Sequence, residues 1–169
     1  MKKYTIKLKK YSDVIEELVA NAAIIPGMLV ELMSTGKVRA HAGANQDAFP
    51  MFALEDELQG KGIDDSYAAN DPVQVWVPGR GDIVNCLLTD EEHVIVGDWV
   101  VSSGDGRVRK HVRTYESFES VDNQPAMSVY TRAIIGQVVE AVDLSAYPEG
   151  SESSAGGEYY HPRVQVRIL

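Results

Sequence analysis

The chain has 169 residues, of which 44% are hydrophobic, so it is long enough to bury one sizeable core. Its net charge of −9 argues against nucleic acid as a partner, and no apolar run approaches the roughly eighteen residues of a membrane span. The basic start is followed by no long apolar stretch, so neither a signal peptide nor a membrane contact is expected. The single cysteine, Cys86, lies in an apolar run, where a buried and inert thiol is expected.

The first ten residues differ in charge from the rest of the chain. They hold five of the sixteen cations and no acid, which leaves 11 cations against 25 acids in the remainder. Tyr4, Ile6 and Leu8 alternate with Lys7 and Lys9, the period-two pattern of a strand with one apolar and one charged face. Such a strand could be an arm that adds to a partner's sheet edge, or the first strand of the body, and the sequence leaves both interpretations open.

Residues 13–20 are predicted to form one short helix or turn. Ser12 is a suitable capping residue, apolar residues follow at helical spacing, and acids occupy the first turn. We therefore expect residues 1–23 to comprise an extended N-terminal arm and this helix or turn. Residues 24–169 are expected to form the body.

The body is expected to consist of short strands separated by turn residues. The expected strands are residues 28–32, 37–41, 52–54, 73–77, 82–88, 93–96, 99–102, 107–111, 134–142 and 163–169. Several short strands at this spacing are typical of a small barrel or sandwich, so the predicted fold class is mainly β. Residues 147–162 are rich in proline, glycine and serine, which predicts a flexible, exposed loop.

A long polar connection, residues 55–71, separates two of these strands and is called the acidic loop below. Its acids are dense enough to suggest calcium, but they lack the spacing of a calcium-binding loop, so a solvated loop is favoured. Loops of this length often carry contacts. The acids concerned are Glu55, Asp56, Glu57, Asp64 and Asp65.

Residues typical of catalysis or metal binding are scattered along the chain. The four histidines, His41, His93, His111 and His161, do not share the close spacing of a zinc site, and no serine lies in a nucleophile elbow. We therefore expect no enzyme activity and no cofactor, although an enzyme with a dispersed site remains an alternative. Trp76 and Trp99 fall in valine-rich runs, where core packing is expected.

Four segments resemble the head decoration proteins of tailed bacteriophages. They are residues 27–32 with 36–38, residues 52–67, residues 97–106 and residues 135–141. The second is the most distinctive, because an acidic loop that ends in an aromatic residue, Tyr67, is not dictated by generic barrel packing. The resemblance implies a compact β-barrel or β-tulip body, a homotrimer, and an N-terminal arm that reaches capsid subunits.

The resemblance also implies a function. The protein would be a virion component that binds the outer surface of the expanded head and stabilises it by bridging subunits of the major capsid protein. The expected capsid-binding residues are Tyr4, Ile6, Lys7, Leu8 and Lys9 of the arm, with Glu55, Asp56, Glu57, Asp64, Asp65 and Tyr67 of the acidic loop as a second group. A small β-barrel module that binds a ligand or a sugar is the alternative from another class.

Overall fold

The computed structural model describes residues 4–11, 13–112, 134–145 and 162–169, which form a mainly β protein. The strands are β1 (Lys7–Lys9), β2 (Val14–Ala20), β3 (Val30–Leu32), β4 (Lys37–Ala40), β5 (Phe52–Ala53), β6 (Pro72–Val77), β7 (Ile83–Leu87), β8 (His93–Val94), β9 (Trp99–Ser102), β10 (Val108–Lys110), β11 (Gly136–Val138), β12 (Val142–Asp143) and β13 (Arg163–Ile168). The predicted fold class is therefore confirmed. Most of the predicted loop 147–162 lies outside the described residues.

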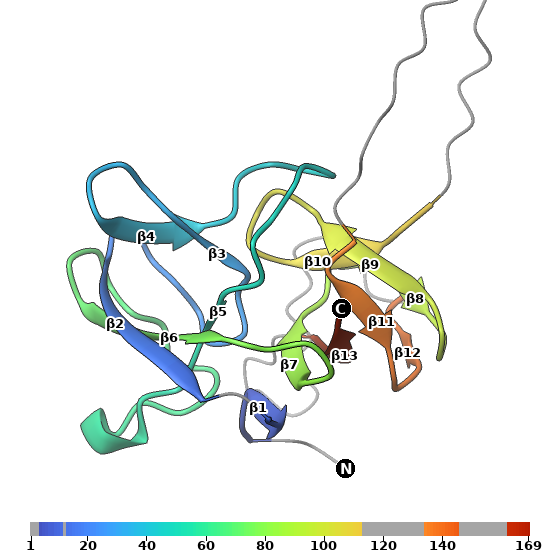
Figure 1. The fold of residues 1–169 in the computed structure, drawn as a ribbon, viewed down its shortest axis with the longest axis horizontal. Helices are drawn as coiled ribbons and strands as arrows, with labels where there is room; N and C mark the ends of the chain where they lie inside the picture. The colour runs from blue at the N-terminus through green and yellow to red at the C-terminus, as the bar shows by residue number, and fades with distance from the viewer. Residues whose placement is uncertain (1–3, 12, 113–133, 146–161) are drawn as a thin grey trace, which may run out of the picture.

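The strands form two main sheets that lie side by side (Figure 1). A five-stranded sheet has the order β3-β4-β2-β6-β5, and a six-stranded sheet has the order β1-β7-β13-β11-β9-β10. β8 and β12 pair separately, so the run predicted as one strand, residues 134–142, is divided between β11 and the start of β12. The strands expected at residues 28–32 and 37–41 form a hairpin, since β3 and β4 pair antiparallel.

The five-stranded sheet curls on itself. Hydrogen bonds from Val30 N to Met51 O (2.9 Å) and from Ala53 N to Met28 O (3.0 Å) bring β5 beside the start of β3. On the opposite side β2 and β4 diverge, and they pair only at Val19–Ala20 with residues 37–38. The described residues therefore contain no closed barrel, and the expected barrel becomes a curled sheet with one open side.

The helix or turn predicted for residues 13–20 is wrong, because this stretch is strand β2. It pairs antiparallel with β6 along its whole length, with Ile15 opposite Trp76 and Leu18 opposite Val73. Three of its residues are β-branched and suit a pleated surface, and cross-strand packing outweighs the apparent capping signal. The one helix that the described residues contain is the short 3-10 helix η1 (Glu57–Gln59).

The N-terminal strand belongs to the body. β1 pairs antiparallel with β7 at the edge of the six-stranded sheet, and Ile6 is completely buried in the core between the sheets. The sequence left two interpretations open, an arm or a first strand of the body. In the structure this segment is the first strand of the body. No helix in the described part of the chain has the length and apolar character needed to cross a membrane.

Two hydrophobic clusters form the core and stabilise the two sheets. The larger one lies between them and contains Phe52 and Trp76 from one sheet with Val84 and Val166 from the other. The smaller one fills the curl of the five-stranded sheet and contains Val30, Val38, Tyr67, Val73 and Val75. Because the larger cluster draws on both sheets, neither sheet can keep its full core without the other.

Main-chain contacts also join the sheets. Leu29 N donates to Gly106 O at 2.7 Å, and Gly106 N donates to His41 O at 3.2 Å. Gly106 has a φ of 81°, and a Cβ atom there would lie 3.0 Å from Ala40 Cβ. A side chain at this position would therefore strain the junction.

Candidate binding surfaces

The N-terminal strand and the acidic loop, predicted as separate docking groups, contact each other. The carboxylate of Glu55 accepts hydrogen bonds from the Thr5 hydroxyl and from Ile6 N, the latter at 3.1 Å. Asn85 N in turn donates to Ile6 O at 2.9 Å. Ile6 is thus fixed by main-chain and side-chain bonds, and its side chain is not available to a partner, whereas Tyr4 is 69% exposed.

Most acids of the acidic loop accept hydrogen bonds or pair with a cation within the protein. Asp56 is buried and caps η1 by accepting from Gln59 N, and Asp65 accepts from Gly62 N at 2.7 Å. Asp64 pairs with the buried guanidinium of Arg163 at 2.7 Å. These carboxylates are therefore structural acceptors, which leaves few charged groups of this loop for a partner.

The aromatic residue of the loop is also part of the core. Tyr67 is completely buried, and its hydroxyl donates to Leu54 O at 2.7 Å. Burial and the nearby carboxylates raise the pKa of Tyr67 to about 12. The tip of the loop, residues 57–60, is exposed, and the Leu58 side chain is 94% exposed.

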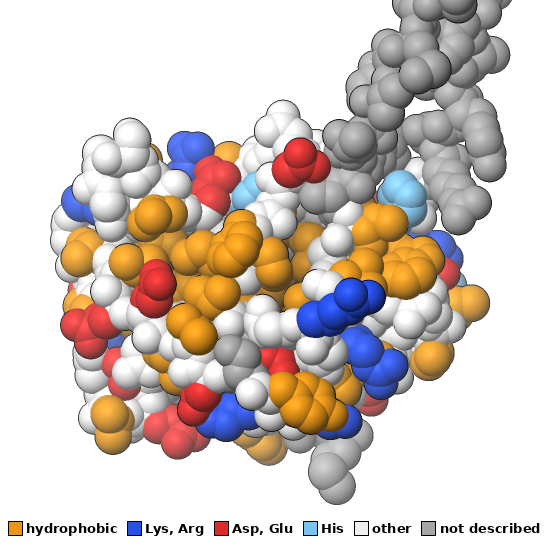
Figure 2. Space-filling view, viewed as in Figure 1, with side chains coloured by type: hydrophobic (Ala, Val, Ile, Leu, Met, Phe, Trp, Pro, Cys, Tyr) orange, Lys and Arg blue, Asp and Glu red, His pale blue; other side chains and the backbone are white. Residues whose placement is uncertain are grey.

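The open side of the curled sheet provides a different surface. Val14 and Ile15 are successive residues of β2, so their side chains point to opposite faces of the sheet. Both side chains are nevertheless exposed, by 50% and 40% respectively. Only β6 pairs with this half of β2, so one edge of residues 14–18 has no strand partner among the described residues. Figure 2 shows further hydrophobic side chains gathered over β3 and β5, the end strands of the same sheet.

The six-stranded sheet carries an opposite charge pattern. No strand of this sheet contains an acid, in a chain that has 25. Its cations are Lys7, Lys9, Arg109, Lys110, Arg163 and Arg167. Figure 2 shows Lys and Arg side chains beside hydrophobic ones on the right, where this sheet lies.

Strand register places five residues of this sheet in one line. Lys9 is opposite Ile83, Ile83 is opposite Arg167, Arg167 is opposite Gln137, and Gln137 is opposite Trp99. Directly opposed residues share a face, and neighbouring strands are about 4.8 Å apart, so the line is roughly 20 Å long. We call it the cross-strand row, and its members are all half-buried or exposed.

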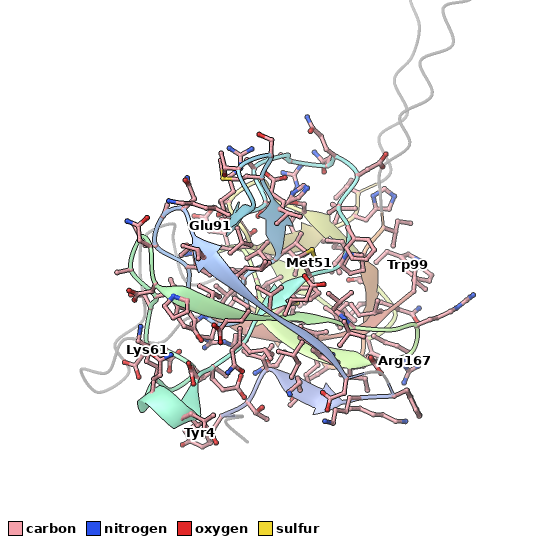
Figure 3. All side chains as sticks on the ribbon, turned by 60° about the vertical axis from the view of Figure 1, so that its left-hand side comes forward. Tyr4, Met51, Lys61, Glu91, Trp99 and Arg167 are labelled. Carbon is pink, nitrogen blue, oxygen red and sulfur yellow. The ribbon has the colours of Figure 1, made fainter. Side chains whose placement is uncertain are left out.

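The cross-strand row could not be identified from the sequence, because its members come from five separate strands. Trp99 was expected in the core, but it lies on the outer face and is partly exposed, whereas Trp76 is buried as predicted. Figure 3 shows Trp99 and Arg167 on the same side of the molecule. The Arg167 guanidinium makes no hydrogen bond or ion pair within the described residues.

One pair of side chains resembles part of a hydrolytic site. Ser102 Oγ lies 2.8 Å from His41 Nδ1, and His41 Nε2 lies 3.7 Å from Glu31 Oε2. Ser102 is completely buried and its Oγ also accepts from Gly104 N at 3.2 Å, so the hydroxyl is out of reach of a substrate. The pair ties the end of β4 to β9 and is structural.

Neither a metal site nor a reactive thiol is present in the described part of the chain. No group of three or more His, Cys, Asp or Glu residues there is placed to hold an ion. Cys86 is buried as expected, and desolvation raises the pKa of its thiol to about 12, which keeps it protonated and inert.

No protein-family model matches the chain, and no curated protein is significantly similar to it.

Proposed function

We propose that this protein is a capsid decoration protein of a tailed phage, which binds the outer surface of the expanded head and bridges subunits of the major capsid protein. The resemblance of four segments to such proteins supports this assignment. The single structural observation that carries it is the open edge of β2. An exposed strand edge with apolar side chains on both faces is suited to accept an extended segment of a large protein partner.

The docking surface proposed here differs from the one expected from the sequence. Ile6 and Tyr67 are buried, and most acids of the acidic loop bond to other groups of the protein. These groups therefore stabilise the body and are not available to a partner. In β2, main-chain groups along residues 14–18 would supply hydrogen bonds, and Val14 and Ile15 would supply apolar contacts.

Bridging would stabilise the expanded shell by mass action. A ligand that binds one state and not the other shifts the equilibrium toward the bound state. As a homotrimer, the protein would present three such edges, so modest individual contacts would give tight attachment. No catalysis or cofactor is required for this function.

The proposal is tested by co-sedimentation with unexpanded and expanded capsids of the phage that encodes the chain. The wild-type protein should sediment with expanded capsids and not with unexpanded ones. Val14→Asp places a charge in the open edge and should weaken binding about tenfold or more, since apolar anchors dominate such interfaces. Leu58→Asp is the matched control, because it adds the same charge at an exposed apolar position outside the edge.

Two results would contradict the proposal. Equal sedimentation with both forms of the capsid would remove the preference for the expanded head. Equal binding by Val14→Asp and the wild type, with circular dichroism showing that both are folded, would exclude the β2 edge as the docking surface.

A further inference from the structure

We propose that the cross-strand row on the six-stranded sheet is a binding site for an acidic polysaccharide. A sugar ring would pack against the indole of Trp99, and a carboxylate would pair with the guanidinium of Arg167. This site lies on a different sheet from the β2 edge and does not depend on the proposed capsid function.

The first support is the geometry of the row. Trp99 and Arg167 are two strands apart, with Gln137 between them, so their backbones are separated by about 10 Å. Their side chains leave the same face of the sheet, and both are long enough to contact one ligand of one or two sugar units. Figure 3 shows them on one side of the molecule.

The second support is the state of the polar groups. The Arg167 side chain is exposed and makes no ion pair within the described residues, although the chain has an excess of acids. By contrast, Lys110 pairs with Asp98 at 2.7 Å. A guanidinium of this kind can bind a carboxylate through two parallel hydrogen bonds. Gln137 donates to Gly97 O at 3.1 Å, which leaves its amide oxygen for a hydroxyl group.

The third support is the charge of the surroundings. Lys9 extends the row at one end, Arg109 lies on the neighbouring β10, and no strand of the sheet carries an acid. The acids of the other sheet, Glu16, Glu17 and Glu31, lie on β2 and β3. A negatively charged polymer would therefore be attracted to the six-stranded sheet despite the net charge of −9.

The same features favour a polysaccharide over an acidic peptide. The central strands β7, β13, β11 and β9 have strand partners on both sides, so a peptide cannot add to the sheet at the row. Recognition must come from the indole, amide and cationic side chains. A ring that combines an apolar face, hydroxyl groups and a carboxylate is complementary to all three kinds.

The site is tested by isothermal titration of the full chain with polygalacturonate, polyglutamate and dextran. Polygalacturonate has both rings and carboxylates and should bind. Polyglutamate, which lacks sugar rings, should bind at least about tenfold more weakly, and dextran, which lacks charge, should not bind measurably. If polyglutamate bound as tightly as polygalacturonate, the binding would be unspecific charge attraction and the proposal would be overturned. If dextran bound as tightly as polygalacturonate, the carboxylate would play no part, which would also overturn the proposal.

Variants then assign the binding to the row. Arg167→Gln and Trp99→Ala should each weaken polygalacturonate binding about tenfold. Lys37→Gln and Leu32→Ala are matched controls on the five-stranded sheet and should change the affinity less than twofold. Arg167 is exposed, so Arg167→Gln tests the site even if Trp99→Ala does not fold. Unchanged binding by Arg167→Gln, or equal losses in the controls, would overturn the assignment.

Discussion

Arg163 is the residue on which the acidic loop depends. Its Nη1 donates to Asp64 at 2.7 Å, and its Nη2 donates to Ile63 O at 2.5 Å and to Pro26 O at 3.2 Å. Arg163→Met leaves two buried carbonyl oxygens and the half-buried Asp64 carboxylate without their donor, so we expect the free energy of unfolding to fall by about 3 kcal/mol. Urea denaturation measures this change.

The control for this prediction is an exposed pair. Arg39 bonds Glu31 at 2.7 Å, but its side chain is 46% exposed, so Arg39→Met should cost less than about 1 kcal/mol. Equal losses in the two variants would show that the Arg163 contacts add nothing beyond an ordinary surface pair.

Asp143 provides a test of a titrating group. Its carboxylate accepts from Ser145 Oγ at 2.6 Å and from Ser145 N at 3.0 Å, and these bonds, with His93, lower its pKa to about 2. This pKa lies below the value of about 3.9 expected in the unfolded chain. Asp143 therefore stabilises the folded state above about pH 3.9, and this stabilisation is lost as the pH falls through about 2.

The Ser145 hydroxyl is the largest cause of this shift. We therefore expect Ser145→Ala to raise the pKa of Asp143 more than His93→Gln does, as followed by NMR titration of the carboxyl carbon. A larger rise in His93→Gln would mean that His93, and not Ser145, is the main cause of the lowered pKa of Asp143.

At the scale of elements, β1 changes the expected role of the N-terminus. Removal of an independent arm would leave folding intact, but Ile6 is completely buried between the sheets. Ile6→Ala should therefore lower the free energy of unfolding by about 3 kcal/mol, because it removes buried methyl groups and leaves a cavity. Tyr4→Ala, at a 69% exposed position of the same segment, should cost much less. Similar small losses in both variants would restore the interpretation as an arm.

The elements that the sequence predicted well have local signals. β3 and β4 are joined by a short turn with a glycine, and β13 alternates strictly, so each can be identified without its partners. β2 has no such signal, since four of its seven residues in succession are exposed and its partner β6 lies more than fifty residues further on. Its structure is fixed by that distant pairing.

The candidate sites were less predictable than the strands, because they are formed by residues that lie far apart in the sequence. Glu55 and Ile6 are 49 residues apart, and Ser102 and His41 are 61 apart, so only the folded chain brings them together. The cross-strand row requires the register of five strands, of which β1 and β13 lie at opposite ends of the sequence. Residue types alone suggested a core position for Trp99, because a valine-rich run does not reveal which face is outward.

At the scale of the whole molecule, the shared core predicts that the two sheets unfold together. The chain has two tryptophans, and they report on different sheets: Trp76 lies on β6 of the five-stranded sheet and Trp99 on β9 of the six-stranded sheet. In Trp76→Phe and in Trp99→Phe, the remaining indole should give a urea midpoint that equals the midpoint from far-UV circular dichroism of the same variant. Comparison within each variant removes the effect of the substitution on stability. Because Phe52, Trp76, Val84 and Val166 pack in one cluster, loss of either sheet would expose core residues of the other, which couples the two transitions. A Trp99 midpoint that differs from the circular dichroism midpoint would instead show two units that unfold separately.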